Sequence, residues 1–249
     1  MICLSSVPNV LYPDWSTKLR ALMPRSLQSV IRPIWRAARP ALYRARYGFF
    51  PPPDGIDLVG YETLIDFMRA KGVFGVPGDI VEIGAFCGGG TYKLARSLLH
   101  LRSSKRVIAV DCFDVTFDNT QCTEGIPMSQ LYARCLGGRS QMEMFCKVTR
   151  GLQNVVVIAA DSRRVSLPTD AVCFAFIDGN HAPDYVRNDF LLVWEKLSPG
   201  GVVAFHDYGY DLPMVTSTLD DLCAQHRSEI QESYVDAQKH ILFIQKMRG

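Results

Sequence analysis

The sequence of 249 residues contains no C-x-x-C pair, although it has eight cysteines. Zinc-binding domains hold their metal with closely spaced cysteine pairs, so a zinc site is disfavoured. Several cysteines fall in expected strands, where we expect reduced thiols. No apolar run approaches the roughly 18 residues that suggest a membrane-spanning helix. Residues 1–12 lack the basic cluster and apolar core of a secretory signal, so we expect a cytoplasmic protein.

Acidic residues are almost absent from the first fifty positions. Residues 1–50 carry eight Lys/Arg against Asp14 alone, whereas the rest of the chain has 19 basic and 24 acidic residues. Apolar and basic side chains separate on a helical projection of this segment, and prolines divide it into short helices. We interpret residues 1–53 as a basic helical N-terminal extension. It is expected to serve as a lid, as a subunit contact in a homo-oligomer, as a peripheral contact with an anionic membrane, or as a plain extension.

Basic residues do not interleave with aromatic residues elsewhere in the chain, so nucleic acid is disfavoured as a partner. A chain of this length, 48% hydrophobic and 21% charged, can bury one α/β core with an appendage. We assign that core to residues 54–249. Apolar runs predict strands at residues 80–83, 106–111, 154–161, 172–181 and 202–208, then a terminal hairpin at 229–234 and 240–245.

Residues 78–91 have the pattern of a buried strand, a glycine turn and a helix start. Four glycines between Gly84 and Gly90 let the backbone turn tightly and approach a ligand closely. Thr91 is expected to cap a helix whose N-terminal amides point at the turn. This arrangement is typical of a nucleotide-type cofactor site. Phe86 stands two residues after Gly84, so the dinucleotide fingerprint G-x-G-x-x-G is missing and NAD is disfavoured.

Carboxylates follow two further strands. The second strand ends in Asp111, and the third ends in Asp161 and Ser162. Ligands bind at the carboxyl ends of strands in open α/β sheets, so Asp111 is expected beside the glycine turn, where it can accept hydrogen bonds from ribose hydroxyls. The alternative is an aspartate that caps the next turn. Residues 112–138 have weak periodicity and are expected to form a long functional loop.

Four titratable groups follow the next two strands. Asp178 and His181 follow the fourth strand, and His206 and Asp207 end the fifth, which comes after an expected turn at residues 198–201. Because these strands are expected to be neighbours, the four groups should converge at one edge of the cofactor cleft. For each histidine, the alternative is a packing or capping role.

The motifs together resemble a known family. They are Glu82-x-Gly84, Asp111, Ile177-Asp178-Gly179-Asn180-His181 with Tyr185 and Asp189, Pro199-Gly200-Gly201, and His206-Asp207-Tyr208. This set resembles the class I S-adenosylmethionine (SAM)-dependent O-methyltransferases related to macrocin O-methyltransferase (TylF) and other sugar-modifying enzymes of natural-product pathways. The resemblance covers residues 61–249. It implies an α/β fold with a Rossmann-like seven-stranded sheet and an antiparallel last strand.

The resemblance also implies the ligands of the site. The cofactor SAM would be held by Glu82, Gly84, Ala85, Phe86, Gly88, Thr91, Asp111, Asp161, Ser162 and Asp178. Mg²⁺ or another divalent cation would bind Asp178 and Asp207, with His181 as general base and His206 as a second candidate. Family members with a strong metal site usually present a carboxylate where this chain has His206, and Mg²⁺ prefers oxygen ligands.

The expected activity is therefore methyl transfer to a hydroxyl of a sugar or glycosylated natural product. A divalent cation would lower the pKa of that hydroxyl, and a histidine would take its proton. Two alternatives stay open: a catechol-type small-molecule O-methyltransferase, and a methyltransferase-like protein that binds SAM without catalysis. The basic extension suggests an acidic, phosphorylated or lipid-linked acceptor.

Overall fold

The computed structural model describes residues 37–52 and 57–248. The chain divides into two units between Pro51 and Pro52. In the first unit residues 37–47 are helical, and the rings of Tyr43 and Tyr47 lie 4.7 Å apart between centroids. The helices expected before residue 37 lie outside the described residues. The boundary after residue 53 and the roles of the extension stay predictions.

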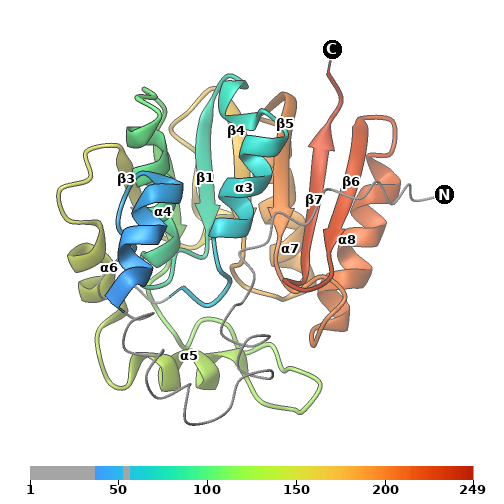
Figure 1. Ribbon diagram of the computed structural model, residues 1–249. Helices are drawn as coiled ribbons and strands as arrows, with labels where there is room; N and C mark the ends of the chain where they lie inside the picture. The colour runs from blue at the N-terminus through green and yellow to red at the C-terminus, as the bar shows by residue number, and fades with distance from the viewer. Residues whose placement is uncertain (1–36, 53–56, 249) are drawn as a thin grey trace, which may run out of the picture. The chain divides into compact units, whose positions relative to one another are not determined.

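A seven-stranded sheet forms the centre of the second unit (Figure 1), in the order β3-β2-β1-β4-β5-β7-β6. The strands are β1 (Asp79–Ile83), β2 (Val107–Asp111), β3 (Val155–Ala159), β4 (Val172–Ile177), β5 (Leu197–Phe205), β6 (Ile230–Asp236) and β7 (Ile241–Lys246). Strands β1 to β5 pair in parallel, and β7 runs antiparallel to both β5 and β6. The predicted Rossmann-like sheet with an antiparallel last strand is confirmed.

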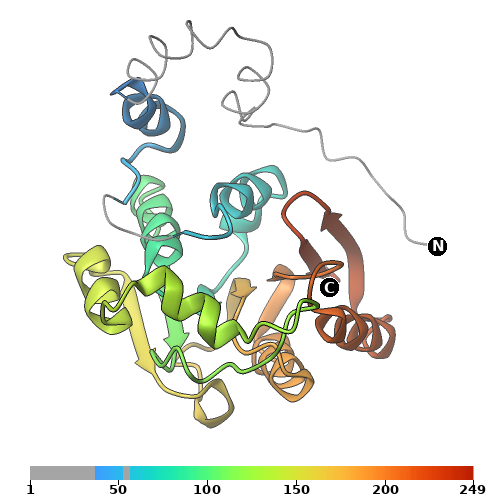
Figure 2. The same cartoon turned by 90° about the horizontal axis from the view of Figure 1, so that it is seen from below.

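Helices cover both faces of the sheet (Figure 2). Helices α3 (Glu62–Ala70), α4 (Gly89–His100) and α6 (Gln141–Thr149) cover one face, and α7 (Pro183–Trp194) and α8 (Pro213–Gln225) cover the other. All six residues of β4 are buried, as expected for a parallel strand with helices on both sides. In the described part of the chain, no helix has the length and apolar content needed to cross a membrane.

The register of the sheet brings the predicted site residues to one level. Ile83 of β1 pairs with Val110 of β2 and with Ile177 of β4, and Ile177 pairs with Phe205 of β5. The next residues along these strands are Gly84, Asp111, Asp178 and His206. The chain runs outward from β1 in one direction to β2 and β3, and in the other to β4 and β5. The carboxyl ends of β1 and β4 therefore flank the crevice where such sheets bind ligands.

The prediction that Thr91 caps the helix was wrong. Helix α4 begins at Gly89, and its N-cap residue is Gly88, which has a left-handed backbone with φ of 79° and no side-chain cap. Thr91 lies in the first turn of the helix, and its hydroxyl donates a hydrogen bond to the carboxylate of Glu82. A glycine accepts the left-handed turn without steric cost, so no hydroxyl cap is needed there.

Two expected irregular segments are also ordered differently. Residues 112–138 were expected to be a loop, but they contain helix α5 (Met128–Leu136), which crosses beneath the carboxyl ends of the strands (Figures 1 and 2). Only Leu136 of this helix is buried, so the helix contributes little to the core. The turn expected at residues 198–201 belongs to β5, where a register shift and Gly200, with φ of 80°, mark a bulge.

Candidate active site

The glycine turn after β1 is pinned between two neighbouring strands. The Gly84 N–H donates to the Val110 carbonyl over 2.9 Å, and the Asp178 N–H donates to the Ile83 carbonyl over 2.8 Å. Gly84 has φ of 90°, and a Cβ atom added there would lie 2.0 Å from the carbonyl oxygen of Asp178. The turn therefore requires glycine for its left-handed conformation and for the close approach of β4.

Asp111 connects this turn to the end of β2. Its carboxylate accepts hydrogen bonds from the N–H groups of Phe86 (2.8 Å) and Phe113 (2.6 Å), and from Nε2 of Gln141 (3.2 Å). Burial raises the pKa of Asp111, although these hydrogen bonds lower it in part. These contacts agree with the alternative that Asp111 caps the next turn. Asp111 also lines the pocket described next.

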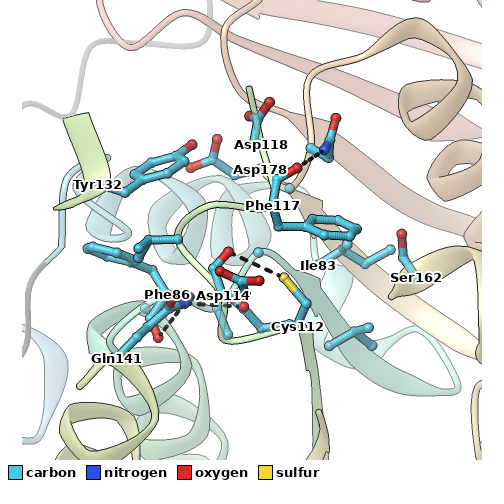
Figure 3. A pocket seen from close by; sticks show the side chains of 18 of the residues that line it. Ile83, Phe86, Cys112, Asp114, Phe117, Asp118, Tyr132, Gln141, Ser162 and Asp178 are labelled. Carbon is cyan, nitrogen blue, oxygen red and sulfur yellow. Dashed lines mark hydrogen bonds between the residues drawn. The ribbon is translucent and has the colours of Figure 1, made fainter. Parts of the chain in front are cut away.

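A pocket of about 860 Å³, counting the space open to solvent, lies at the carboxyl ends of the strands (Figure 3). Cofactor sites commonly have volumes of about 300–1,000 Å³. Among the described residues that line it there are six aspartates and no lysine, arginine or histidine; the aspartates are Asp57, Asp111, Asp114, Asp118, Asp161 and Asp178. Aromatic rings of Phe86, Phe117 and Tyr132 also face it. This lining suits a ligand that combines positive charge with a flat ring.

Seven of the ten predicted cofactor-binding residues line this pocket: Gly84, Ala85, Phe86, Asp111, Asp161, Ser162 and Asp178. Glu82, Gly88 and Thr91 do not line it and instead support the turn from behind. The Asp161 carboxylate accepts hydrogen bonds from two other groups of the protein, the Arg163 N–H (2.9 Å) and the Tyr185 hydroxyl (3.2 Å). Its predicted role in holding SAM stays a prediction.

Glu82 is a fully buried carboxyl group behind the turn. Burial raises its pKa to about 7, against the opposing effect of hydrogen bonds from the Thr91 and Tyr61 hydroxyls. The folded state therefore holds this proton more tightly than the unfolded chain, whose carboxyl titrates near 4.5. The stability that Glu82 contributes is fully present below pH 4.5, and it is lost as the pH rises toward 7.

Glu82→Gln is expected to remove this pH dependence, because glutamine keeps the size of the side chain without its charge. Above pH 8 the variant should be more stable than the wild type by roughly 2–3 kcal/mol, and the difference should vanish near pH 4.5. Urea unfolding across this pH range measures the effect, with the exposed Glu195→Gln as control. A stability difference that is constant with pH would contradict the assignment.

A cluster of titratable groups adjoins the pocket. His181, only 4% exposed, lies between two carboxylates, with Nδ1 2.6 Å from Asp118 Oδ2 and Nε2 2.9 Å from Asp207 Oδ2. His206 Nδ1 lies 3.1 Å from Asp207 Oδ2 and 3.4 Å from Asp178 Oδ1. The structure thus brings together the four groups singled out in the sequence and adds Asp118 to them.

The carboxylates determine the charge of both histidines. Burial lowers the pKa of His181, but hydrogen bonds to Asp118, Asp178 and Asp207 outweigh it, and the net pKa lies well above the ordinary value. Burial opposes the same effect at His206, whose pKa rises to about 10. The two imidazolium groups in turn hold the pKa values of Asp178 and Asp207 below their usual range, although burial alone would raise them. An imidazolium has no lone pair, so neither histidine acts as a base in this charge state.

Three members of the cluster fit a metal ion. Asp178, His181 and Asp207 each offer one ligand atom, and these atoms lie within 4.8 Å of one another. Two carboxylate oxygens and one imidazole nitrogen suit Mn²⁺, Fe²⁺ or a similar ion better than Mg²⁺, which prefers oxygen. Asp207 also has a left-handed backbone with φ of 59°, a conformation that is uncommon outside glycine and gathers at functional sites.

Sequence reasoning missed Asp118 and Tyr132. Asp118 is buried beside His181, and Tyr132 of α5 points its hydroxyl toward Asp178 (Figure 3). The ring of Tyr132 lies 5.6 Å from the Phe86 ring, and burial together with the Asp178 charge raises its pKa well above the usual value. Both residues come from the segment 112–138, which was expected to be a loop and contained no motif that pointed to them.

Comparison with known proteins identifies the class of protein that this fold and site define. A family model described as a methyltransferase domain matches residues 81–208, just over half of the chain. The chain therefore belongs to this family and is a SAM-dependent methyltransferase. No curated protein matches the sequence.

Solved structures of methyltransferases share the fold. The O-methyltransferase NovP is 18% identical, with a TM-score of 0.61 over 78% of this chain and 81% of its own. CalS11, described as a TDP-rhamnose 3'-O-methyltransferase of calicheamicin biosynthesis, is 13% identical, with a TM-score of 0.51 over 96% of this chain and 88% of its own. At such identities the likeness establishes the fold alone.

Proposed function

We propose that this protein is a metal-assisted O-methyltransferase of the macrocin O-methyltransferase (TylF)-like group, acting on a hydroxyl of a sugar or glycosylated natural product. One observation carries the proposal: Asp178 belongs both to the acidic pocket and to the Asp–His cluster. A cofactor in the pocket and a hydroxyl at the cluster would therefore share one carboxylate. The similarity of fold to CalS11, which is described as a TDP-rhamnose 3'-O-methyltransferase, supports this class of acceptor.

The pocket residues fit SAM as cofactor. SAM supplies a methyl carbon made electrophilic by a positively charged sulfur. Gly84 has no side chain and lies close to β4, which leaves room for such a group. The acidic lining of the pocket complements its positive charge. Asp111 retains oxygen lone pairs that can accept hydrogen bonds from ribose hydroxyls. The chain's contribution is to align the acceptor oxygen with the methyl carbon, which accounts for a large share of catalysis in such transfers.

The cluster residues divide the remaining work. Asp178, His181 and Asp207 would hold the cation, and a bound cation would lower the pKa of the acceptor hydroxyl. Its positive charge would offset the carboxylates that keep His206 protonated. His206, with 21% of its side chain exposed against 5% for His181, is then the group placed to accept the hydroxyl proton. We therefore assign the base to His206 and the ligand role to His181, although His181 was predicted as base.

The basic residues 1–53 are proposed to contact a partner subunit or an anionic membrane surface. The proposed methyl transfer does not depend on where these residues lie. The test is a variant that lacks residues 1–46. If this variant keeps both methyl transfer and vesicle binding, the support for a role of this segment is removed.

Calorimetric titration with SAM, S-adenosylhomocysteine and NAD tests the cofactor. We expect saturable binding of both adenosyl ligands and none of NAD, followed by methyl transfer to glycosides that EDTA abolishes and Mn²⁺ or Mg²⁺ restores.

Absence of binding by both adenosyl ligands would refute the cofactor assignment. Activity that EDTA leaves unchanged would refute the metal. Transfer to catechols but not glycosides would favour the small-molecule alternative, and SAM binding without any transfer would favour the non-catalytic one.

A further inference from the structure

We propose that Asp118 is a positioning residue, which fixes the imidazole ring of His181 so that Nε2 is directed at Asp178 and Asp207. The inference rests on the proposed function and extends it to a residue outside every motif in the sequence. Asp118 comes from the segment between β2 and α5, 63 positions before His181 in the chain. It acts through the histidine rather than on the reacting atoms.

The contact between the two side chains is short and shielded from solvent. Asp118 Oδ2 lies 2.6 Å from His181 Nδ1, and only 6% and 5% of the two side chains is exposed. A carboxylate on one ring nitrogen fixes both the orientation and the tautomer of an imidazole, and it makes the other nitrogen a stronger ligand. Here the other nitrogen, Nε2, is the atom that lies 2.9 Å from Asp207 and 3.7 Å from Asp178.

Asp118 is itself held in place by the surrounding backbone. Its Oδ1 accepts a hydrogen bond from the Thr120 N–H (2.9 Å), and its carbonyl oxygen accepts one from the Ser129 N–H (2.8 Å) at the start of α5. The preceding carbonyl, of Phe117, accepts a hydrogen bond from Nδ2 of Asn180 (3.2 Å), next to His181 (Figure 3). The backbone at Asp118 is therefore anchored from α5 and from the end of β4, and the carboxylate is anchored by the Thr120 N–H.

This anchoring separates a positioning role from simple charge balance. A carboxylate that only neutralised His181 would need no defined orientation, and Asp207 already lies on the other nitrogen of the ring. The anchored Asp118 instead prevents the ring from turning its Nδ1 toward the metal ligands. The same residue connects the helix that carries Tyr132 to the centre of the site, because its carbonyl oxygen accepts the hydrogen bond from Ser129 in the first turn of α5.

Asp118→Asn tests the inference against Glu124→Gln, an exposed carboxylate in the same segment. The measurements are Mn²⁺ affinity by calorimetry, kcat and KM, and the ¹⁵N signals of the His181 ring, which report the protonation and hydrogen bonding of each ring nitrogen. We expect Asp118→Asn to weaken Mn²⁺ binding and lower kcat about 10–100-fold. The Nδ1 signal of His181 should lose the shift that its hydrogen bond to Asp118 produces. Circular dichroism and thermal unfolding check that the variant is folded.

Wild-type ring signals and Mn²⁺ affinity in Asp118→Asn would overturn the inference, as would equal losses in Glu124→Gln. If Asp118→Asn does not fold, Asp118→Glu, which keeps the carboxylate, replaces it, and an unaltered Nδ1 signal with unaltered kcat in that displaced geometry would count against positioning. The ring signals also separate this inference from the proposed function. A wild-type enzyme that binds no Mn²⁺ refutes the proposed metal, whereas the Nδ1 signal of the protonated ring still shows whether Asp118 accepts its hydrogen bond.

Discussion

Asp207→Asn is expected to lower kcat about 10²–10⁴-fold, the loss that follows removal of a group acting on proton transfer or on a bound cation. Asp207 contacts both histidines of the cluster, with Oδ2 2.9 Å from His181 Nε2 and 3.1 Å from His206 Nδ1. The substitution removes one of the proposed metal ligands and the negative charge beside His206. Asparagine is the suitable replacement, because it tolerates the left-handed backbone, with φ of 59°, that Asp207 adopts.

SAM affinity should hardly change in the same variant, since Asp207 is not among the residues that line the pocket. We therefore expect steady-state kinetics to show a large loss of kcat and calorimetry to show nearly unchanged SAM affinity in the same variant. Asp220→Asn is the matched control, because it removes an exposed carboxylate that accepts a hydrogen bond from the Tyr208 hydroxyl. Full activity of Asp207→Asn would contradict the assignment of the cluster to catalysis, and lost SAM binding would show that Asp207 belongs to the cofactor site instead.

Gly84→Ala is expected to destabilise the fold by about 2–6 kcal/mol, from backbone strain and from overpacking together. Alanine at φ of 90° is strained, and its Cβ would lie 2.0 Å from the Asp178 carbonyl oxygen. Relief requires β1 and β4 to separate at the point where Asp178 enters the pocket. SAM binding should therefore weaken along with stability.

Gly75→Ala provides the comparison, because a Cβ at that position meets no atom within 4 Å and its φ is not in the left-handed region. It should unfold close to the wild-type midpoint in urea. If Gly84→Ala unfolds at the wild-type midpoint, the close approach of the two strands is not needed for stability. If it loses SAM binding without losing stability, the role of this glycine is confined to the ligand.

Strand ends were predictable because a buried parallel strand leaves a strong local signal. Apolar runs identified β1, β2, β4 and β5, and each run stops at a residue whose side chain can face the crevice. The order of the strands follows general rules for α/β sheets, so Asp178 and His206 were expected to be neighbours. The resemblance of the motifs then supplied the cofactor, which no spacing of residues could have supplied alone.

Conformation at the ends of the strands was not predictable. Five described residues other than glycine have positive φ, and three of them, Phe86, Phe113 and Asp207, directly follow β1, β2 and β5 or lie within three residues of them. Phenylalanine gives no local warning of a left-handed backbone. Aspartate is enriched in this conformation, but the residue type does not fix it at Asp207, because the conformation is imposed by contacts made elsewhere in the fold. The Asp111 hydrogen bonds to the Phe86 and Phe113 N–H groups are such contacts.

The sequence by itself determined the class of fold, the position of the cofactor turn and four of the five members of the Asp–His cluster. Those features depend on burial patterns and strand order, which are local or follow from general packing rules. Only the tertiary structure decided that Asp118 faces His181, that Tyr132 points toward Asp178, and that His181 has a carboxylate on each ring nitrogen. Such pairings join a segment that was expected to be a loop to a distant strand end, so they depend on contacts that no stretch of sequence records.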